Sequence, residues 1–311
     1  MTQGTRMRLT IATRRSRLAL WQAGHVKSRL EALHAGLRVE LLALSTRGDE
    51  LADASLAKEG GKGLFIKELE TALAEGRAEL AVHSMKDLPA ELPVGFALAA
   101  ILAREDPRDS FVSYYFENLS VLPPGSNVGT SSLRRQAQIT ARYPALKILP
   151  LRGNVETRIA KLDRGDYAAI VLAAAGLKRL GLEARIRSYL SVEESLPAAG
   201  QAALGIECLA ARVDLLKFLD VLNDRKTSVC VRAERQVNRS LGGNCAIPLG
   251  AYAELAGERL RLRALVASPD GKRVARAEGE GEASDPEALG LRVAGLLRDR
   301  GATEIISALS P

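Results

Sequence analysis

A single acidic residue beside a lysine stands where a buried strand is expected to end. Leu80 to Val82 form a short apolar run, and the polar residues His83 to Asp87 follow it before Pro89. Such a run is typical of a buried strand, and proline stops its regular continuation. Ligands of open α/β sheets bind outside the carboxyl ends of the strands, so Asp87 is a candidate catalytic carboxylate. The alternative for Lys86 and Asp87 alone is a solvated ion pair, which contributes little.

Ser/Thr/Arg turns occur twice, each between an expected strand and an expected helix. Thr13 to Ser16 follows a strand over 8–12, and Thr130 to Arg135 follows a strand over 127–129. The free N–H groups and the dipole of a helix start bind anions, although either turn alone is more often only a cap. Two such turns favour two facing lobes that bind one anionic ligand. Further arginines at expected strand ends or early helix turns are Arg152, Arg158 and Arg179.

The composition points to a small anionic ligand rather than to nucleic acid. The net charge is +7 over 311 residues, but the arginines are scattered and aromatic residues make up only 4%. Nucleic-acid binders usually show a basic stripe with stacking aromatics, whereas arginine holds carboxylates in a bidentate fork. The alternative is a solvated basic surface that keeps the protein soluble. No apolar run is long enough to span a membrane and no signal peptide opens the chain, so we expect a cytoplasmic protein.

One of the three cysteines differs from the others in its setting. Cys208 and Cys230 lie in apolar patterns and are expected to be buried packing residues. Cys245 follows two glycines and an asparagine, so its thiol is expected to reach a cleft and to hold a group covalently. The odd count and the dispersed cysteines and histidines argue against a disulfide framework and against a metal site.

Expected strands and helices alternate along most of the chain, which predicts an α/β fold. Segments 104–109 and 196–201 are candidate hinges, and the glycine-rich stretch 46–63 is expected to be a lid or a binding loop. The predicted fold class is therefore α/β, with two hinged lobes and a small α+β C-terminal domain. The predicted boundaries are 1–103 plus about 203–222 for the first lobe, 104–202 for the second lobe, and 223–311 for the C-terminal domain.

Several motifs, in this order and over nearly the whole chain, resemble the porphobilinogen deaminase (hydroxymethylbilane synthase) family. They share short runs of glycine, arginine and hydroxyl residues around the turns described above. The motifs are 11–14, 18–22, 46–49, 61–65, 83–87, 129–135, 151–154 and 175–181.

The resemblance implies a specific transferase of heme biosynthesis. Family members are monomers of three domains, of which the first two resemble periplasmic binding proteins. They join four porphobilinogen molecules head to tail, release ammonia at each step, and free hydroxymethylbilane from its primer with water. The primer is a dipyrromethane cofactor, which the resemblance attaches to Cys245 through a thioether. The implied partners are porphobilinogen and the growing oligopyrrole, without nucleic acid or membrane.

The resemblance also assigns the site residues, and the residue types suit the chemistry. Each pyrrole ring brings an acetate and a propionate, so a growing chain needs many cations, while a carboxylate stabilises the cation formed as ammonia leaves. Asp87 is the implied catalytic residue and is expected to be the one acid in a basic cleft. The implied cofactor-binding residues are Ser84, Lys86, Asp87, Thr130, Ser131, Ser132, Arg134, Arg135, Gly153 and Cys245. The implied substrate-binding residues are Arg14, Ser16, Phe65, Arg152, Arg158, Arg179 and Gln201.

Four positions depart from the family pattern. Arg17 stands where proline is expected and is a candidate for a further anion contact. Glu156 replaces a small residue beside Arg158, and it either pairs with an arginine or weakens anion binding. Ala202 replaces a glycine in the second hinge, which is expected to stiffen it, and Asn244 replaces a glycine before the cysteine.

Two other functions stay open from the sequence. A non-catalytic, two-lobed anion-binding or sensor protein is the first alternative, although the absence of a signal peptide and the setting of Cys245 speak against it. Nucleic-acid binding is the second, and the low aromatic content speaks against it.

Overall fold

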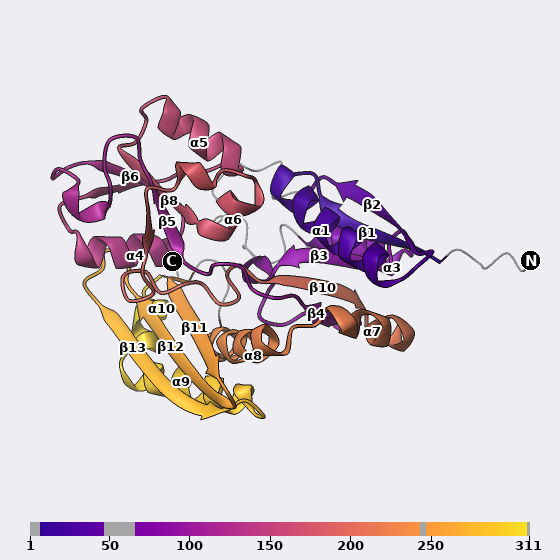
Figure 1. The fold of residues 1–311 in the computed structure, drawn as a ribbon. Helices are drawn as coiled ribbons and strands as arrows, with labels where there is room; N and C mark the ends of the chain where they lie inside the picture. The colour runs from indigo at the N-terminus through magenta and orange to yellow at the C-terminus, as the bar shows by residue number, and fades with distance from the viewer. Residues whose placement is uncertain (1–6, 47–65, 243–246, 310–311) are drawn as a thin grey trace, which may run out of the picture.

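The described part of the chain forms three β-sheets, each covered by helices (Figure 1). The computed structural model describes residues 7–46, 66–242 and 247–309. Two sheets have five strands and belong to α/β lobes, while the third has three strands and belongs to a small C-terminal domain. The predicted fold class is confirmed.

The first sheet has the strand order β2-β1-β3-β10-β4. Strands β1, β2 and β3 run parallel, and β10 lies antiparallel between β3 and β4. Helices α1 and α7 pack on one face through a core that includes Leu9, Val26 and Leu215, and α3 packs on the other face beside Ala12 and Leu69. The elements are β1 (Arg8–Arg14), α1 (Arg17–Leu33), β2 (Arg38–Leu44), α3 (Lys67–Ala74), β3 (Leu80–Ser84), β4 (Phe96–Ile101), β10 (Leu204–Leu209) and α7 (Val213–Leu219).

The second sheet repeats this plan with the order β7-β6-β8-β5-β9. Helix α4 covers one face through Ile139, and α5 and α6 cover the other through Ile159 and Leu177. The elements are β5 (Asp109–Val112), β6 (Asn127–Gly129), α4 (Leu133–Arg142), β7 (Lys147–Leu149), α5 (Val155–Asp163), β8 (Ala169–Ala173), α6 (Ala174–Arg179) and β9 (Ser188–Leu190).

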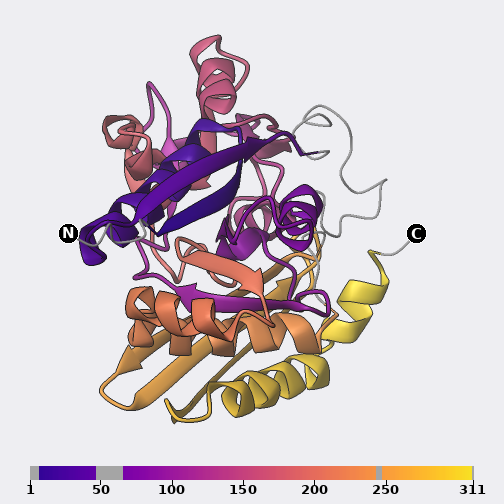
Figure 2. The ribbon, with the colours of Figure 1, turned by 90° about the vertical axis from the view of Figure 1, so that its right-hand side faces the viewer.

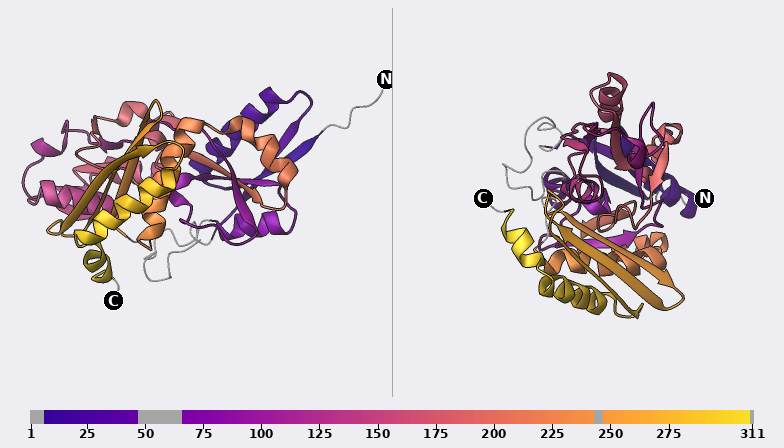
Figure 3. Two further views of the ribbon diagram at one scale, coloured as in Figure 1. Left: turned by 90° about the horizontal axis from the view of Figure 1, so that it is seen from below. Right: turned by 90° about the vertical axis from the view of Figure 1, so that its left-hand side faces the viewer.

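The third sheet is an antiparallel meander, β11-β12-β13, and its core is the largest apolar cluster of the C-terminal domain. Helices α8 and α9 lie side by side on one face of it (Figure 3). Helix α8 also runs beneath β4 of the first sheet (Figure 2), and it thereby joins this domain to the first lobe. The elements are α8 (Arg225–Ser240), β11 (Leu249–Ala256), β12 (Arg259–Ala267), β13 (Val274–Glu282), α9 (Pro286–Asp299) and α10 (Ala302–Ser307).

Several predictions about local structure can be compared with the fold. Cys208 and Cys230 are buried, as predicted. The interpretation of 104–109 as linker is wrong at its end, because Asp109 is fully buried and opens β5. Helix α6 and strand β9 were not predicted, because both are short and lack a clear apolar period. The domain boundaries stay a prediction.

The two segments predicted as hinges lie against each other. Glu105 N donates to Ala202 O at 3.3 Å, and Gln201 Nε2 donates to Pro107 O at 2.6 Å. Ala202 has a φ of 72°, the left-handed conformation that costs a residue with a side chain about 1–2 kcal/mol. This strain is held by its neighbours, since Arg179 Nη2 also donates to Ala202 O at 2.6 Å.

Gly200 sits directly against the turn that carries Asp87, so a side chain there should disturb that turn. Its φ is +72°, and an added Cβ would lie 2.7 Å from Met85 Cβ and 3.4 Å from Lys86 N. We expect Gly200→Ala to lower the free energy of unfolding by roughly 2–4 kcal/mol, combining left-handed strain with overpacking. Urea unfolding measures the loss.

Gly165→Ala is the matched control, because Gly165 has a φ of +82° but nothing within 4 Å of its Cβ position. It should cost only about 1 kcal/mol. Equal losses in the two variants would show that the contact with Met85 is unimportant.

Candidate active site

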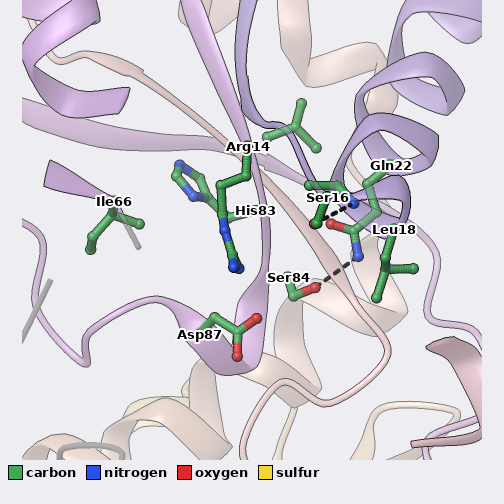
Figure 4. A pocket seen from close by; sticks show the side chains of 10 residues that line it. Arg14, Ser16, Leu18, Gln22, Ile66, His83, Ser84 and Asp87 are labelled. Carbon is green, nitrogen blue, oxygen red and sulfur yellow. Dashed lines mark hydrogen bonds between the residues drawn. The ribbon is translucent and has the colours of Figure 1, made fainter. Parts of the chain in front are cut away.

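A pocket opens at the carboxyl ends of β1 and β3, where the sequence predicted a ligand. Asp87 lies at its edge, and the side chain of Arg14 extends toward it (Figure 4). Gln22 Nε2 donates to Ser84 Oγ at 2.8 Å across the pocket wall. The lining residues are Arg14, Ser16, Leu18, Ala19, Gln22, Ile66, Val82, His83, Ser84 and Asp87.

The chain presents Asp87 because the turn before it is anchored in the core. Met85 is 1% exposed, and its N–H donates to Ala203 O at 3.0 Å. A single 3-10 turn, Met85–Asp87, follows β3. Met85 points inward, whereas Lys86 is half-buried and Asp87 is exposed. The turn therefore presents the carboxylate of Asp87 at the surface of the first lobe.

The charges near Asp87 come from both lobes and are mostly positive. Burial lowers the pKa of Lys86 to about 8, with Arg135 and Arg134 adding to the shift while Asp87 and Asp109 oppose it. Burial and then Arg135 lower the pKa of Arg158 to about 10, against the pull of Asp87. Burial is the main cause of both shifts, and the charge of Arg135 adds to each of them. An anionic ligand would offset the burial of these cations and their mutual repulsion.

A buried carboxylate, Asp109, holds two of the predicted arginines. Arg134 Nη1 donates to Asp109 Oδ2 and Arg135 Nη2 donates to Asp109 Oδ1, both at 2.8 Å. Ser195 Oγ and Gln201 Nε2 donate to the same carboxylate at 2.7 and 2.9 Å. Burial would raise the pKa of Asp109, but the two guanidinium groups hold it well below its usual range. Asp109 is thus a second acid close to the cleft, but it is fully buried, and Asp87 is the acid among the residues that line the pocket.

Predicted hydroxyl and glycine residues of the second lobe shape its helix starts. Ser132 Oγ accepts from Arg135 N at 3.4 Å and caps α4. Ser131 Oγ donates to Leu151 O and accepts from Leu151 N, both at 3.0 Å. Thr130 Oγ1 accepts from Ser132 N. Gly153 has a φ of +105°, and its O accepts from Arg158 Nε at 2.8 Å. These contacts fix the turns that follow β6 and β7.

The other predicted site residues occupy three settings. Ser16 caps α1 as predicted, by accepting from Ala19 N. Arg179 lies between the lobes, with its guanidinium carbon 5.7 Å from the ring centre of Trp21. Arg152 adjoins Gly153 at the start of α5, and its O accepts from Lys161 Nζ at 3.1 Å. Phe65, Cys245 and the stretch 47–63 lie outside the described residues.

Sequence reasoning missed a buried polar cluster behind the pocket. His83 Nε2 lies 2.8 Å from Glu207 Oε2, and the Glu207 side chain is fully buried. Burial raises the pKa of Glu70, which also senses the charge of Glu207. Arg235 of α8 donates from Nη2 to the O atoms of Pro89 and Ala90 at 2.8 and 3.1 Å. A glutamate inside the apolar run of β10 was the available signal, since an acid in a central strand needs a partner.

The described residues contain no group of three or more His, Cys, Asp or Glu side chains that could hold a metal ion. No helix in these parts of the chain has the length and apolar character needed to cross a membrane.

Two α/β lobes face each other, and lysine and arginine side chains near the ends of their strands surround the exposed carboxylate of Asp87. This arrangement defines the class of protein. The family description "Porphobilinogen deaminase, dipyromethane cofactor binding domain" matches residues 9–217, and "Porphobilinogen deaminase, C-terminal domain" matches residues 228–299. The chain belongs to the porphobilinogen deaminase family.

Two porphobilinogen deaminases are similar to this chain over nearly its full length. The porphobilinogen deaminase of Thiobacillus denitrificans is 60% identical over 301 residues, covering 97% of this chain and 98% of that protein. The one from Bordetella parapertussis is 59% identical over 304 residues, covering 98% and 97%. Among solved structures, the periplasmic aliphatic sulphonate binding protein SsuA from Escherichia coli has a TM-score of 0.41 at 12% identity, covering 75% of this chain and 70% of that one.

These findings confirm the predicted activity class. The chain is a transferase of tetrapyrrole biosynthesis that makes hydroxymethylbilane, and it carries the family's dipyrromethane cofactor-binding domain.

Removing the charge of Asp109 should destabilise the fold. We expect Asp109→Asn to lower the free energy of unfolding by about 3–5 kcal/mol, because two buried guanidinium groups lose their counter-ion. Folding lowers the pKa of Asp109, so its contribution is present above the unfolded value of about 3.9 and is lost as the pH falls below it. The gap between wild type and variant should therefore narrow on acidification. Urea unfolding at several pH values measures it.

Asp166→Asn is the control, because Asp166 pairs with Arg164 at the surface. Asp166→Asn should lower the free energy of unfolding by only a small part of the loss expected for Asp109→Asn. A gap for Asp109→Asn that stays constant below pH 4 would contradict the electrostatic explanation.

Proposed function

We propose that Asp87 is the catalytic carboxylate of this enzyme and that Cys245 carries the dipyrromethane cofactor. The observation that carries the proposal is the grouping of cations from both lobes around one exposed acid: Lys86 adjoins Asp87 in the same turn, and Arg158 and Arg135 of the second lobe lie close enough to interact electrostatically with this pair. A substrate chain that gains two carboxylates with each ring suits such a site.

The cleft suits the cofactor as well as the substrate. Dipyrromethane has two rings, each with two carboxylates, and when bound it supplies the pyrrole carbon on which the chain grows. Lys86 and Arg158 are cations of this cleft, and Asp87 is the carboxylate that acts on both, so they can hold such a group. Arg235 links α8, which precedes Cys245 in the chain, to the carbonyls just after Asp87.

Asp87 would act on the charge that develops when the substrate amine leaves. An ionised carboxylate stabilises a nearby carbocation and accepts hydrogen bonds from pyrrole N–H groups. It can also take the proton that the attacked ring carbon must lose. Its place on a turn held by Met85 lets it reach into the cleft without moving the strand behind it.

The remaining predicted residues would bind carboxylates in two ways. Arg14, Arg152, Arg158 and Arg179, with Ser16 and Lys86, would contact substrate or cofactor directly. Arg134 and Arg135 already donate hydrogen bonds to Asp109. They would therefore attract substrate or cofactor carboxylates through the positive charge that Asp109 leaves uncompensated. Ser84, Thr130, Ser131, Ser132, Gly153, Gln201 and Phe65 complete the proposed set.

We further propose that the enzyme acts as a cytoplasmic monomer on porphobilinogen and the growing oligopyrrole, without nucleic acid. The aromatic content of 4% and the gathering of cations at strand ends support a small anionic substrate.

Asp87→Asn tests the catalytic role. We expect turnover to fall by about 10²–10⁴-fold, because the amide cannot carry charge or accept the proton. Cofactor loading should persist, since the cations remain. Steady-state assays with porphobilinogen measure turnover, and Glu91→Gln, which removes an exposed carboxylate of the following segment, is the control. Near-normal turnover in Asp87→Asn would mean that this acid is only a surface residue.

Cys245→Ser tests the attachment site. Purified wild type should weigh more than its sequence mass by one dipyrromethane, and the variant should lack that addition. Intact-protein mass spectrometry measures both. Cys230→Ser, which changes a buried thiol, should keep the addition. An active wild type at the bare sequence mass would refute the proposed attachment.

A further inference from the structure

An ion pair joins the two α/β lobes at the starts of α1 and α5. Arg17 Nη1 lies 3.2 Å from Glu156 Oε1. Arg17 is the first residue of α1 in the first lobe, and Glu156 is in the first turn of α5 in the second. Figure 1 shows α5 and α6 on the side of the second lobe that faces α1. Two of the four positions that depart from the family pattern are thus partners of each other.

The contact belongs to a wider line of contact between the lobes. A side chain at Gly176 of α6 would touch Leu18 of α1, with its Cβ 3.7 Å from Leu18 Cδ2. Arg179 of α6 lies over Trp21 of α1. The Arg17–Glu156 pair is the charged part of this line, and it lies beside the helix starts that carry the proposed substrate-binding residues.

The two partners are not equally exposed. The Arg17 side chain is 71% exposed, whereas that of Glu156 is 29% exposed. Glu156 Oε1 is closed off from water, and no hydrogen-bond donor is aligned with it among the described residues. Arg17 therefore supplies positive charge to a carboxylate that water does not solvate well at that oxygen. Without Arg17, this poorly solvated carboxylate would lack a counter-charge.

Residues of the proposed substrate site lie close to this pair along the chain. Arg158 follows Glu156 by two residues on α5, and its Nε donates to Gly153 O at the start of the same helix. Arg14 lies three residues before Arg17 and points into the pocket (Figure 4). An uncompensated Glu156 would lower the positive potential that a polyanionic substrate meets at these helix starts.

We propose that Arg17 is a positioning residue that sequesters Glu156 and thereby sets the affinity of the enzyme for its anionic substrate. The inference rests on the proposed roles of Arg14 and Arg158. It makes Glu156 a negative element inside a cationic site, which Arg17 cancels from the opposite lobe.

A double-mutant cycle with porphobilinogen tests this proposal. Arg17→Ala should raise KM about three- to fivefold, as expected for a partly exposed ion pair, with kcat within twofold of wild type. Glu156→Gln should leave KM unchanged or lower it. The double variant should return to the Glu156→Gln value, because no carboxylate is left to release. High salt should shrink the effect of Arg17→Ala, since the Debye length falls to about 3 Å at 1 M.

Arg15→Ala is the matched control, because Arg15 is an exposed arginine of the same turn whose Nε faces Ala43 O rather than α5. It should change KM less than Arg17→Ala does. Thermal unfolding of every variant checks the fold.

Three results would overturn the inference. The first is a KM in Arg17→Ala equal to that in Arg15→Ala. The second is a double variant no better than Arg17→Ala. The third is equal KM shifts in all three variants of the cycle, which would make the pair a simple latch between the lobes. Arg158→Gln separates this inference from the proposed function: if it leaves KM unchanged, the proposed binding site is at fault, and if only Arg17→Ala is silent, the sequestering role falls alone.

Discussion

The arrangement of the site depends on the buried ion pairs of Asp109 with Arg134 and Arg135. This fully buried carboxylate accepts from Arg134, Arg135, Ser195 and Gln201, which come from α4 and from the segment that leads back to the first lobe. A buried charge is tolerated only when its partners are complete and well aligned. The carboxylate therefore fixes α4, the return segment and the start of β5 relative to one another, and so orients the second lobe.

The same network leaves the cleft positively charged. One carboxylate faces two guanidinium groups, so a net positive charge remains near Lys86 and Arg158. Like charges held together in a partly buried site favour a ligand that brings several negative charges. Affinity for a polyanion is in this way a property of the whole arrangement rather than of one arginine.

Distant parts of the chain hold the turn that carries Asp87. Met85 N bonds Ala203 O, Gly200 packs against Met85, and Arg235 of the C-terminal domain bonds the carbonyls of Pro89 and Ala90. All three domains thus meet at the residues around Asp87. A side chain that must meet a developing charge gains from such support, because its position is set before substrate binds.

The sequence alone determined the class of fold and most of the candidate site. Alternating strand and helix patterns placed Ser16, Asp87 and Arg135 at strand ends or helix starts, because those positions follow from local periodicity and capping. It did not reveal that Asp109 opens a strand, that His83 meets Glu207, or that Arg17 meets Glu156. Each of these depends on residues that are distant in the chain, and local propensity carries no information about which distant charge a side chain will face. Only the packing of the two lobes decided those pairings, and with them the charge balance of the cleft.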